Sequence, residues 1–476
     1  MALMVSQLLS QSGIAFGTSG ARGLVSDFSN NNCAAFTQAF IEVMRQGFVF
    51  DRIALGIDNR PSSPQLAAAC AGMARACGVQ VDYYGVVPTP ALAFKAMQDK
   101  IPAVMVTGSH IPFDRNGLKF YRPDGEISKA DEQAIGSVCS RLADYEPELP
   151  PCSDAAATAY MTRYLQAFPA RCLQGKHIGV YEHSSAGRDI YRPLFEQLGA
   201  RVTPLERTDT FVPVDTEAVS EQDQQKARAW SARFGFDAIF STDGDGDRPL
   251  IADEQGQWLR GDIVGLLCAK ALGIGRLAVP VSCNTAIETC GAFSQVVRTR
   301  IGSPYVIAAF DAWQGAAESY AGFEANGGFI LGSPLQLASG ALAALPTRDA
   351  LLPVLALLLA AGSQPLSALS AQLPQRFTAS DRLQQVPVTR SKALLAQAQA
   401  APQQLLSTLG LSGMQVVRLD NTDGLRLTLS NGDILHLRPS GNAPELRCYV
   451  ESGHPQRAAA LVSEVLSRLK AELVQA

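Results

Sequence analysis

The first third of the chain alternates short apolar runs with Ala-rich stretches. The apolar runs predict strands at 52–57, 79–84 and 103–107, because runs of this length between turn signals are typical of buried strands. The Ala-rich stretches predict helices at 64–77 and 91–98. Strands that alternate with helices indicate a mostly parallel sheet covered by helices.

Two further segments repeat this α/β pattern. One begins near residue 176, and the next extends from about 257 to 370. The most apolar stretch, 350–361, is shorter than the roughly 20 residues of a membrane span and contains Pro353. We therefore expect a buried helix there, with Pro353 in its first turn. The other elements expected in these two segments are strands at 176–181, 238–241, 276–280 and 328–331 and a helix at 189–198.

The last hundred residues follow a different pattern. Segments at 414–419, 424–429 and 433–438 predict consecutive strands, separated by Asp-Gly and Asn-Gly turn signals. Helical periodicity follows at 458–473. The chain therefore is expected to end in an α+β unit.

These patterns divide the 476 residues into four units, with a Pro-rich linker ending the first. We expect three α/β domains at 1–150, 151–256 and 257–370, and a smaller α+β domain at 371–476.

Composition and charge narrow the class of protein. The formal net charge is −4, so no overall basic field would recruit nucleic acid or an anionic membrane, and any anion-binding surface must be local. Residues 1–13 lack the basic start and long apolar core of a signal peptide, and none of the ten Cys forms a CxxC pair. We therefore expect a globular enzyme with reduced thiols in the cytoplasm, without nucleic acid or a membrane as partner, and no obligate protein partner is evident.

The first candidate site directly follows the expected strand at 103–107. Ser109 lies near the carboxyl end of that strand, where open α/β sheets place ligands. A hydroxyl needs a base or a metal to act as a nucleophile, and His110 and Lys119 are nearby in sequence. The alternative is an ordinary turn rich in Ser, Gly and Pro.

The second candidate site follows the expected strand at 238–241. Asp243, Asp245 and Asp247 can converge only if a cation offsets their repulsion, and carboxylate oxygens are the ligands that Mg²⁺ prefers. Arg248 beside them favours an anionic ligand shared with the metal over a solvated acidic turn. An EF-hand does not fit, because the loop position that must be Gly is Arg248 and both flanks are predicted strands.

Two later loops carry ligand-binding groups. Glu324 and Asn326 offer donors and acceptors suited to sugar hydroxyls. The loop at 438–447 suits phosphate, because Arg gives planar paired donors and exposed N–H groups form an anion nest. A surface turn remains the alternative for each loop when it is taken alone. The phosphate-binding candidates of the second loop are Arg438, Ser440, Gly441, Asn442 and Arg447.

In order and spacing, these four loops and the opening motif 16–23, with Arg22, resemble the α-D-phosphohexomutase superfamily over nearly the whole chain. The likeness is greatest to its bacterial phosphomannomutase/phosphoglucomutase members. The resemblance implies three related α/β/α domains with mixed sheets and a smaller C-terminal α+β domain around a central cleft. It also implies Mg²⁺ as cofactor, a hexose phosphate as substrate and a hexose 1,6-bisphosphate as activator.

The resemblance implies a role for each motif. Ser109 resembles the catalytic serine that carries the phosphoryl group, and its phosphate joins Asp243, Asp245 and Asp247 as a metal ligand. Residues similar to those that contact the reacting phosphate are Arg22, Lys119 and Arg248, and the general base stays open between Lys119 and His110.

The remaining motifs resemble the substrate contacts of the family. Glu324 and Asn326 fall in the loop that reads the sugar hydroxyls, and Arg300 falls in a substrate-contacting segment. The loop at 438–447 is similar to the one that grips the non-reacting phosphate.

The chain also departs from the family pattern. Gly108 stands where many members have Ala, and Asn442-Ala443 stands where Thr-Glu is frequent. In the sugar loop, Asn326 takes the place of a Ser and Gly328 that of a His. Any role of that His must therefore be taken by another residue or be dispensable.

We expect a phosphohexomutase that interconverts hexose 1-phosphate and hexose 6-phosphate, with mannose phosphate as the leading substrate. Phosphoglucomutase and phosphoglucosamine mutase are alternatives with the same mechanism. Alternatives from other classes are a sugar-phosphate phosphatase and a non-catalytic sugar-phosphate binding protein.

Overall fold

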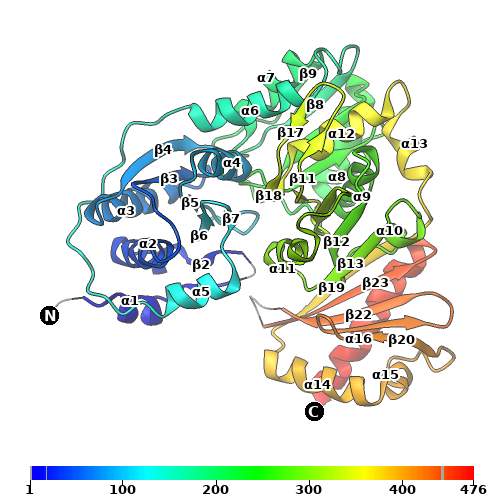
Figure 1. The fold of residues 1–476 in the computed structure, drawn as a ribbon. Helices are drawn as coiled ribbons and strands as arrows, with labels where there is room; N and C mark the ends of the chain where they lie inside the picture. The colour runs from blue at the N-terminus through cyan, green and yellow to red at the C-terminus, as the bar shows by residue number, and fades with distance from the viewer. Residues whose placement is uncertain (1–2, 18, 441–443, 476) are drawn as a thin grey trace.

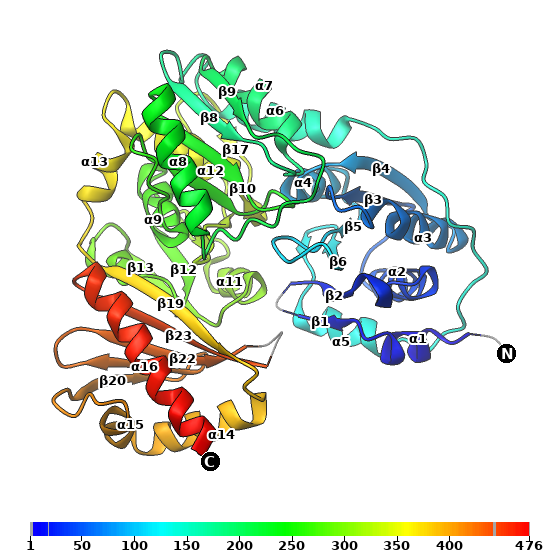
Figure 2. The same cartoon turned by 180° about the vertical axis from the view of Figure 1, so that it is seen from behind.

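The computed structural model describes residues 3–17, 19–440 and 444–475. Four large sheets follow one another along the chain, each with its own helices (Figure 1). The four units form an arc, with the first (blue) and the last (orange to red) at its two ends (Figure 2). Three α/β units followed by an α+β unit are the predicted fold class, which is thereby confirmed. The boundaries given above remain a proposal.

The first unit has a mixed sheet. Its strands are β1 (Ala15–Phe16), β2 (Ala21–Leu24), β3 (Arg52–Ile57), β4 (Gln80–Val86), β5 (Ala103–Val106), β6 (Arg115–Arg122) and β7 (Gly125–Glu126), and its helices are α1 (Val5–Gln11), η1 (Val25–Asp27), α2 (Asn30–Met44), α3 (Ser63–Ala76), α4 (Thr89–Asp99) and α5 (Lys129–Gly136). The order is β1-β2-β6-β5-β3-β4, with β7 beside β6. β3 runs parallel to β4 and β5, so the carboxyl ends of these strands meet at one edge.

The second unit presents its carboxylates on a hairpin. Its strands are β8 (His177–Tyr181), β9 (Arg201–Leu205), β10 (Ala238–Thr242) and β11 (Pro249–Ala252), and its helices are α6 (Ala155–Ala167), α7 (Arg188–Gln197) and α8 (Glu221–Phe234). The order is β11-β10-β8-β9, and only β10 and β11 pair antiparallel. The connection between these two strands holds the three Asp residues.

The third unit contains the most apolar helix. Its strands are β12 (Arg276–Pro280), β13 (Gln295–Thr299), β14 (Tyr320–Phe323), β15 (Phe329–Leu331), β16 (Leu335–Gln336), β17 (Ala341–Leu342) and β18 (Leu345–Asp349), and its helices are α9 (Gly261–Ala271), α10 (Ala286–Thr289), α11 (Ser303–Ala309), η2 (Phe310–Trp313), α12 (Leu351–Ala361) and α13 (Leu366–Ala371). The sheet order is β13-β12-β14-β15-β18. α12 is largely buried and carries Pro353 in its first turn, as predicted.

The fourth unit is an antiparallel sheet with helices. Its strands are β19 (Phe377–Gln384), β20 (Val416–Asp420), β21 (Leu425–Leu429), β22 (Ile434–Pro439) and β23 (Glu445–Ser452), and its helices are α14 (Val388–Ala400), α15 (Pro402–Thr408) and α16 (Pro455–Gln475). The order is β19-β23-β22-β21-β20, and α16 packs on β19 and β23 (Figure 2). Each predicted element is present within two residues at each end, except that α16 begins three residues earlier than predicted.

The apolar cores show which units are packed together. One continuous core runs through the first three units, from Ala54 to Leu373, and the first unit has a second core from Val5 to Leu142. The core of the fourth unit contains no residue of the other three. Polar contacts join the fourth unit to the third: N of Thr285 donates to the Glu451 carboxylate at 3.0 Å, and Nδ2 of Asn284 donates to the Arg376 carbonyl at 2.8 Å. A separately cored unit behind a polar interface is expected to move as a body.

Two observations concern the chain as a whole. Among the described residues, no helix combines the length and apolarity that a bilayer span requires. All ten cysteines are free thiols.

Candidate active site

The loop after β5 carries Ser109 in a strained conformation. Ser109 is fully buried with a φ of 56°, in the left-handed region that residues other than Gly rarely adopt. Arg60, also buried, holds this loop by donating to the carbonyl oxygens of Ser109 (2.8 Å), Ile111 (2.6 Å), Pro112 (2.7 Å) and Arg115 (2.9 Å). The same side chain accounts for Gly108, because a Cβ there would lie 2.6 Å from Cζ of Arg60.

Arg60 is fixed in turn by Asp58, which follows β3. Oδ2 of Asp58 accepts from Nε of Arg60 at 3.1 Å and from Oγ1 of Thr107 at 2.7 Å. Oγ1 of Thr107 accepts from N of Ser109 at 2.8 Å. Asp58 and Arg60 were not singled out from the sequence, although the rule that found Ser109 at a strand's carboxyl end applies equally to them.

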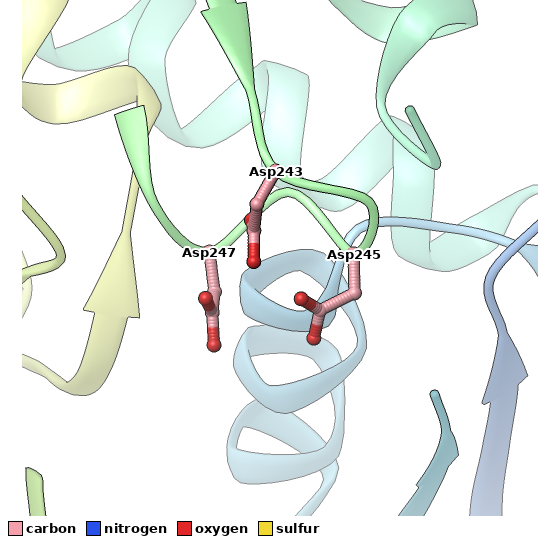
Figure 3. A group of neighbouring side chains, drawn as sticks. All are labelled: Asp243, Asp245 and Asp247. Carbon is pink, nitrogen blue, oxygen red and sulfur yellow. The ribbon is translucent and has the colours of Figure 1, made fainter. Parts of the chain in front are cut away.

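Three carboxylates gather beside Ser109. Asp243, Asp245 and Asp247 are fully buried, and one oxygen of each lies within 4.8 Å of the others. All three side chains point to the same side of their loop (Figure 3). The Ser109 hydroxyl donates to Oδ2 of Asp243 at 2.5 Å. The serine of the first unit and the carboxylates of the second therefore form one site.

These carboxylates fit a divalent cation. Oδ1 of Asp245 and Oδ1 of Asp247 are buried without a hydrogen-bond partner among the residues that the structure describes. Buried acceptors without a partner are costly, and a cation would satisfy both. Nζ of Lys119 offsets part of the charge, since it lies 2.5 Å from Oδ2 of Asp245 and 2.6 Å from Oδ2 of Asp247. Lys119 lies on β6, a strand that the sequence did not predict.

The carboxylates differ in proton affinity. Burial, followed by the charges of Asp245 and Asp247, raises the pKa of Asp243 well above its usual value. Burial also acts to raise the pKa of Asp247, but Arg348 and Lys119 outweigh it and hold that pKa below its usual value. Lys119 likewise holds down the pKa of Asp245 against burial and the charge of Asp247. The negative charge is therefore concentrated on the two carboxylates that have an oxygen without a partner.

The cations beside the serine keep His110 neutral. Burial, followed by Arg248 and Arg22, holds the pKa of His110 well below its usual value. Nη1 of Arg248 lies 3.0 Å from Nδ1 of His110, and because a guanidinium can only donate, Nδ1 accepts. His110 therefore carries its proton on Nε2. Burial and Arg248 lower the pKa of Arg22 to about 10, so Arg22 stays charged at neutral pH.

The predicted sugar loop lies between β14 and β15. Oδ1 of Asn326 accepts from N of Gly328 at 3.0 Å, so this side chain shapes its own loop. Thr216, from the second unit, donates to the Asn326 carbonyl at 2.9 Å. The Glu324 carboxylate accepts from Nη1 of Arg348 at 3.1 Å. Thr216 and Arg348 were missed in the sequence, because no local motif marks them.

The predicted phosphate loop follows β22. Nε of Arg438 donates to Oδ1 of Asp423 at 2.9 Å, and Nε of Arg447 is buried without a hydrogen-bond partner among the described residues. N of Ser440 donates to the Glu445 carbonyl at 2.8 Å. Gly441 and Asn442 lie outside the described residues.

Arg300 is exposed and contacts the fourth unit. Its Nε donates to the Thr422 carbonyl at 3.2 Å, and N of Ile301 donates to Oδ2 of Asp423 at 2.9 Å. Asp423 thus joins the segment of Arg300 to Arg438. The predicted substrate contact of Arg300 stays a prediction.

Charged side chains of the second, third and fourth units affect the pKa of Glu217. Burial and the charge of Asp215 raise the pKa of Glu217, while Arg260, Arg447 and Arg248 act in the opposite direction. Arg447 of the phosphate loop and Arg248 beside the three Asp residues therefore lie within electrostatic reach of one carboxylate.

Comparisons with known proteins agree with this geometry. Models of the phosphoglucomutase/phosphomannomutase family match residues 13–146 (alpha/beta/alpha domain I), 260–377 (alpha/beta/alpha domain III) and 383–468 (C-terminal domain). The chain is 53% identical to a phosphomannomutase of Salmonella muenchen, with 98% of each chain covered. It is 44% identical to a phosphomannomutase of Sinorhizobium fredii, with 96% of this chain and 99% of the relative covered.

A solved structure shows the same fold at lower identity. A phosphoglucomutase/phosphomannomutase family protein from Burkholderia thailandensis superposes with a TM-score of 0.72 at 21% identity, over 95% of this chain and 97% of the other. Together with the family models and the two relatives, this likeness completes the assignment: the chain belongs to the phosphoglucomutase/phosphomannomutase family, within the α-D-phosphohexomutase superfamily.

Proposed function

We propose that this protein is a phosphohexomutase that interconverts mannose 1-phosphate and mannose 6-phosphate through a phosphorylated Ser109. The observation that carries this proposal is the 2.5 Å contact of the Ser109 hydroxyl with Asp243, inside a buried group of three carboxylates. A phosphoryl group on Ser109 would lie against that group, where only a cation can offset the repulsion. Mannose is favoured because the relatives at 53% and 44% identity are phosphomannomutases.

Asp243, Asp245 and Asp247, with an oxygen of the phosphorylated serine, are the proposed ligands of Mg²⁺. The bound ion supplies charge stabilisation to the transferring phosphoryl group. Arg22 and Arg248 share this work, since phosphoryl transfer depends mainly on positioning and charge.

Transfer exchanges one phosphorus–oxygen bond for another. The bond from phosphorus to Oγ of Ser109 breaks as a bond from phosphorus to the free sugar hydroxyl forms. The proton of that hydroxyl passes to a base, and Oγ of Ser109 regains a proton. Lys119 is the proposed base: it gives its proton to Oγ of Ser109 as the bond to phosphorus breaks, and the neutral amine then takes the proton of the sugar hydroxyl. His110 is not assigned this role, because its Nδ1 already accepts from Arg248. The product is a hexose 1,6-bisphosphate, which turns end for end and returns its other phosphate to Ser109.

The two ends of the sugar require separate binding groups. Arg438 and Arg447 are proposed to hold the phosphate that does not react. Because the fourth unit has its own core, it can close over the sugar and exclude water from phospho-Ser109. Free hexose 1,6-bisphosphate is the proposed activator, since it can restore a phosphate that Ser109 has lost. The proposed location is the cytoplasm, in keeping with ten free thiols.

One assay separates the proposed function from its alternatives. Purified protein with Mg²⁺ is incubated with mannose 1-phosphate, and mannose 6-phosphate and inorganic phosphate are both measured. Formation of the 6-phosphate without phosphate release is expected. Steady phosphate release without isomer would identify a phosphatase, and no reaction would favour a binding protein. The values of kcat/KM for mannose, glucose and glucosamine 1-phosphates then rank the sugars.

Arg438→Ala is expected to raise KM for mannose 1-phosphate by roughly 10- to 100-fold, because a hydrogen bond to a charged group contributes about 1.5–3 kcal/mol. Arg457→Ala is the matched control, since Arg457 is a partly exposed arginine of the same unit that pairs with Asp433. Steady-state kinetics on both variants test the assignment. Unchanged KM and kcat in Arg438→Ala would exclude a role in holding the second phosphate.

A further inference from the structure

Arg348 joins three units of the protein at a single buried side chain. It lies on β18 and is 1% exposed. Its Nε and Nη2 lie 3.0 and 2.8 Å from Oδ2 of Asp247, and its Nη1 lies 3.1 Å from Oε2 of Glu324. Nη1 also lies 2.7 Å from Oγ of Ser303, and Nη2 lies 3.4 Å from Oγ of Ser19. Arg348 thus contacts the opening motif, the metal loop and the sugar loop together.

The charge of Arg348 is matched by the two carboxylates that it contacts. A guanidinium taken out of water is tolerated only when it is paired and its donors are used. Arginine suits this task better than lysine, because its planar fork can address two carboxylates in fixed directions. The relative placement of Asp247 and Glu324 is therefore built into the fold before any ligand arrives.

Arg348 leaves one oxygen of each carboxylate free. Its contacts fall on Oδ2 of Asp247 and Oε2 of Glu324. Within the part of the chain that the structure describes, neither Oδ1 of Asp247 nor Oε1 of Glu324 accepts a hydrogen bond. An ionised carboxylate only accepts, so Oε1 can bind a hydroxyl that donates. The bonded oxygens fix the two carboxylates in place, and the oxygens without a partner are available to a cation at Asp247 and to a hydroxyl at Glu324.

Gly328 provides the space that Arg348 occupies. A Cβ on Gly328 would lie 2.5 Å from Cδ and 2.7 Å from Cγ of Arg348. The φ of Gly328 lies outside the left-handed region, so its backbone conformation does not require Gly. The neighbouring Arg348 side chain is what requires Gly at this position. The position at which related sequences often carry His is therefore small here because an arginine from β18 fills the adjacent volume.

We propose that Arg348 is a positioning residue for the sugar: anchored on Asp247 and Ser303, it holds the Glu324 carboxylate where its free oxygen accepts from a hexose hydroxyl. This inference rests on the proposed function, since it takes Glu324 as a sugar contact. Arg348 acts through Glu324 and does not itself touch the substrate. Without Arg348, Glu324 would lose its fixed position, and its contribution to sugar binding would be lost.

A binding cycle tests this coupling without turnover. In the Ser109→Ala background, the affinity for mannose 1-phosphate is measured by calorimetry with Mg²⁺ present. Arg348→Gln and Glu324→Gln are each expected to weaken binding about 10-fold, as for a lost charged hydrogen bond. The double variant is expected to bind with an affinity within about 3-fold of either single variant, because both changes remove the same contact. Arg348→Lys keeps the charge without the fork and is expected not to restore the affinity.

The controls separate positioning from general destabilisation. Arg163→Gln removes another buried arginine, which donates to the Ala343 carbonyl. This variant should bind mannose 1-phosphate as tightly as the background protein does. Gly328→Ala should displace the Arg348 side chain without removing it, and should therefore weaken binding. Combined with Glu324→Gln, it should cause no further loss of affinity. Gly136→Ala, where a Cβ has open space, is its control. If Arg348→Gln does not fold, the Gly328→Ala pair decides the question.

The outcomes distinguish this inference from the proposed function. No binding of mannose 1-phosphate to the background protein would count against the proposed function, and the inference would fall with it. If the background protein binds but the losses of affinity multiply in the double variants, the inference is wrong while the proposed function stands. The same holds if Arg348→Lys binds as tightly as the background protein.

Discussion

Ser109→Ala is expected to abolish mutase turnover, with kcat reduced by roughly 10⁴-fold or more, as is found when a covalent nucleophile is removed. Ser109 is the only group proposed to carry the phosphoryl group between the two sugar ends. Its replacement removes the donor and leaves the other side chains in place. A coupled assay that detects mannose 6-phosphate measures the loss.

Ser231→Ala is the matched control for this variant. Ser231 is buried in α8, away from the site, and its Oγ has no hydrogen-bond partner among the described residues. Turnover should therefore stay at the wild-type level. A Ser109→Ala enzyme that retains turnover within tenfold of wild type would remove the covalent role of Ser109.

Asp245→Asn is expected to lower kcat/KM by at least about 10²-fold, because the metal supplies several kcal/mol of charge stabilisation. The change removes one negative charge and a carboxylate oxygen that has no hydrogen-bond partner among the described residues. The Mg²⁺ concentration for half-maximal rate should rise accordingly. Titrating Mg²⁺ against both rate and melting temperature shows whether metal binding or a later step is affected.

Asp433→Asn tests whether loss of any buried carboxylate has this effect. Asp433 is 3% exposed, but it lies in the fourth unit and pairs with Arg457. Its replacement should leave the Mg²⁺ dependence unchanged. If Asp245→Asn responded to Mg²⁺ as wild type does, the assignment of metal ligands would be wrong.

The sequence predicted the elements whose pattern reflects burial alone. β3, β10 and β12 are apolar runs between turn signals, and all three were found. β6 was missed because it carries Asn116 and Lys119, which are buried for the sake of the site and break the apolar pattern. Buried polar residues of the site thus interrupt the apolar pattern from which a strand is predicted.

The candidate site was predicted where local motifs mark it. Ser109 and the three Asp residues lie in loops after strands, and the structure brings them together. Contacts between distant segments left no local signal: Asp247 and Arg348 are 101 residues apart, and Thr216 and Asn326 are 110 apart. Arg300 illustrates the opposite case, because the structure shows it exposed and bonded to the fourth unit. Spacing along the chain could not reveal these long-range partners.

The division of positive charge fits a substrate with two phosphate positions. Arg22, Lys119 and Arg248 surround the serine, whereas Arg438 and Arg447 belong to a unit with its own core. The first group suits a phosphate that is transferred, and the second suits one that is only held. A mutase needs both, because the same sugar must bind in two orientations.

The proposed phosphorylation of Ser109 is tested most directly by determining which residue of the protein carries phosphate. The protein is incubated with Mg²⁺ and glucose 1,6-bisphosphate, and its intact mass and proteolytic peptides are measured. The proposed mechanism predicts a species heavier by one phosphoryl group, with the modification on the peptide that contains Ser109. A stable phosphate on any other residue, or no phosphorylated species in a protein that still forms mannose 6-phosphate, would contradict it.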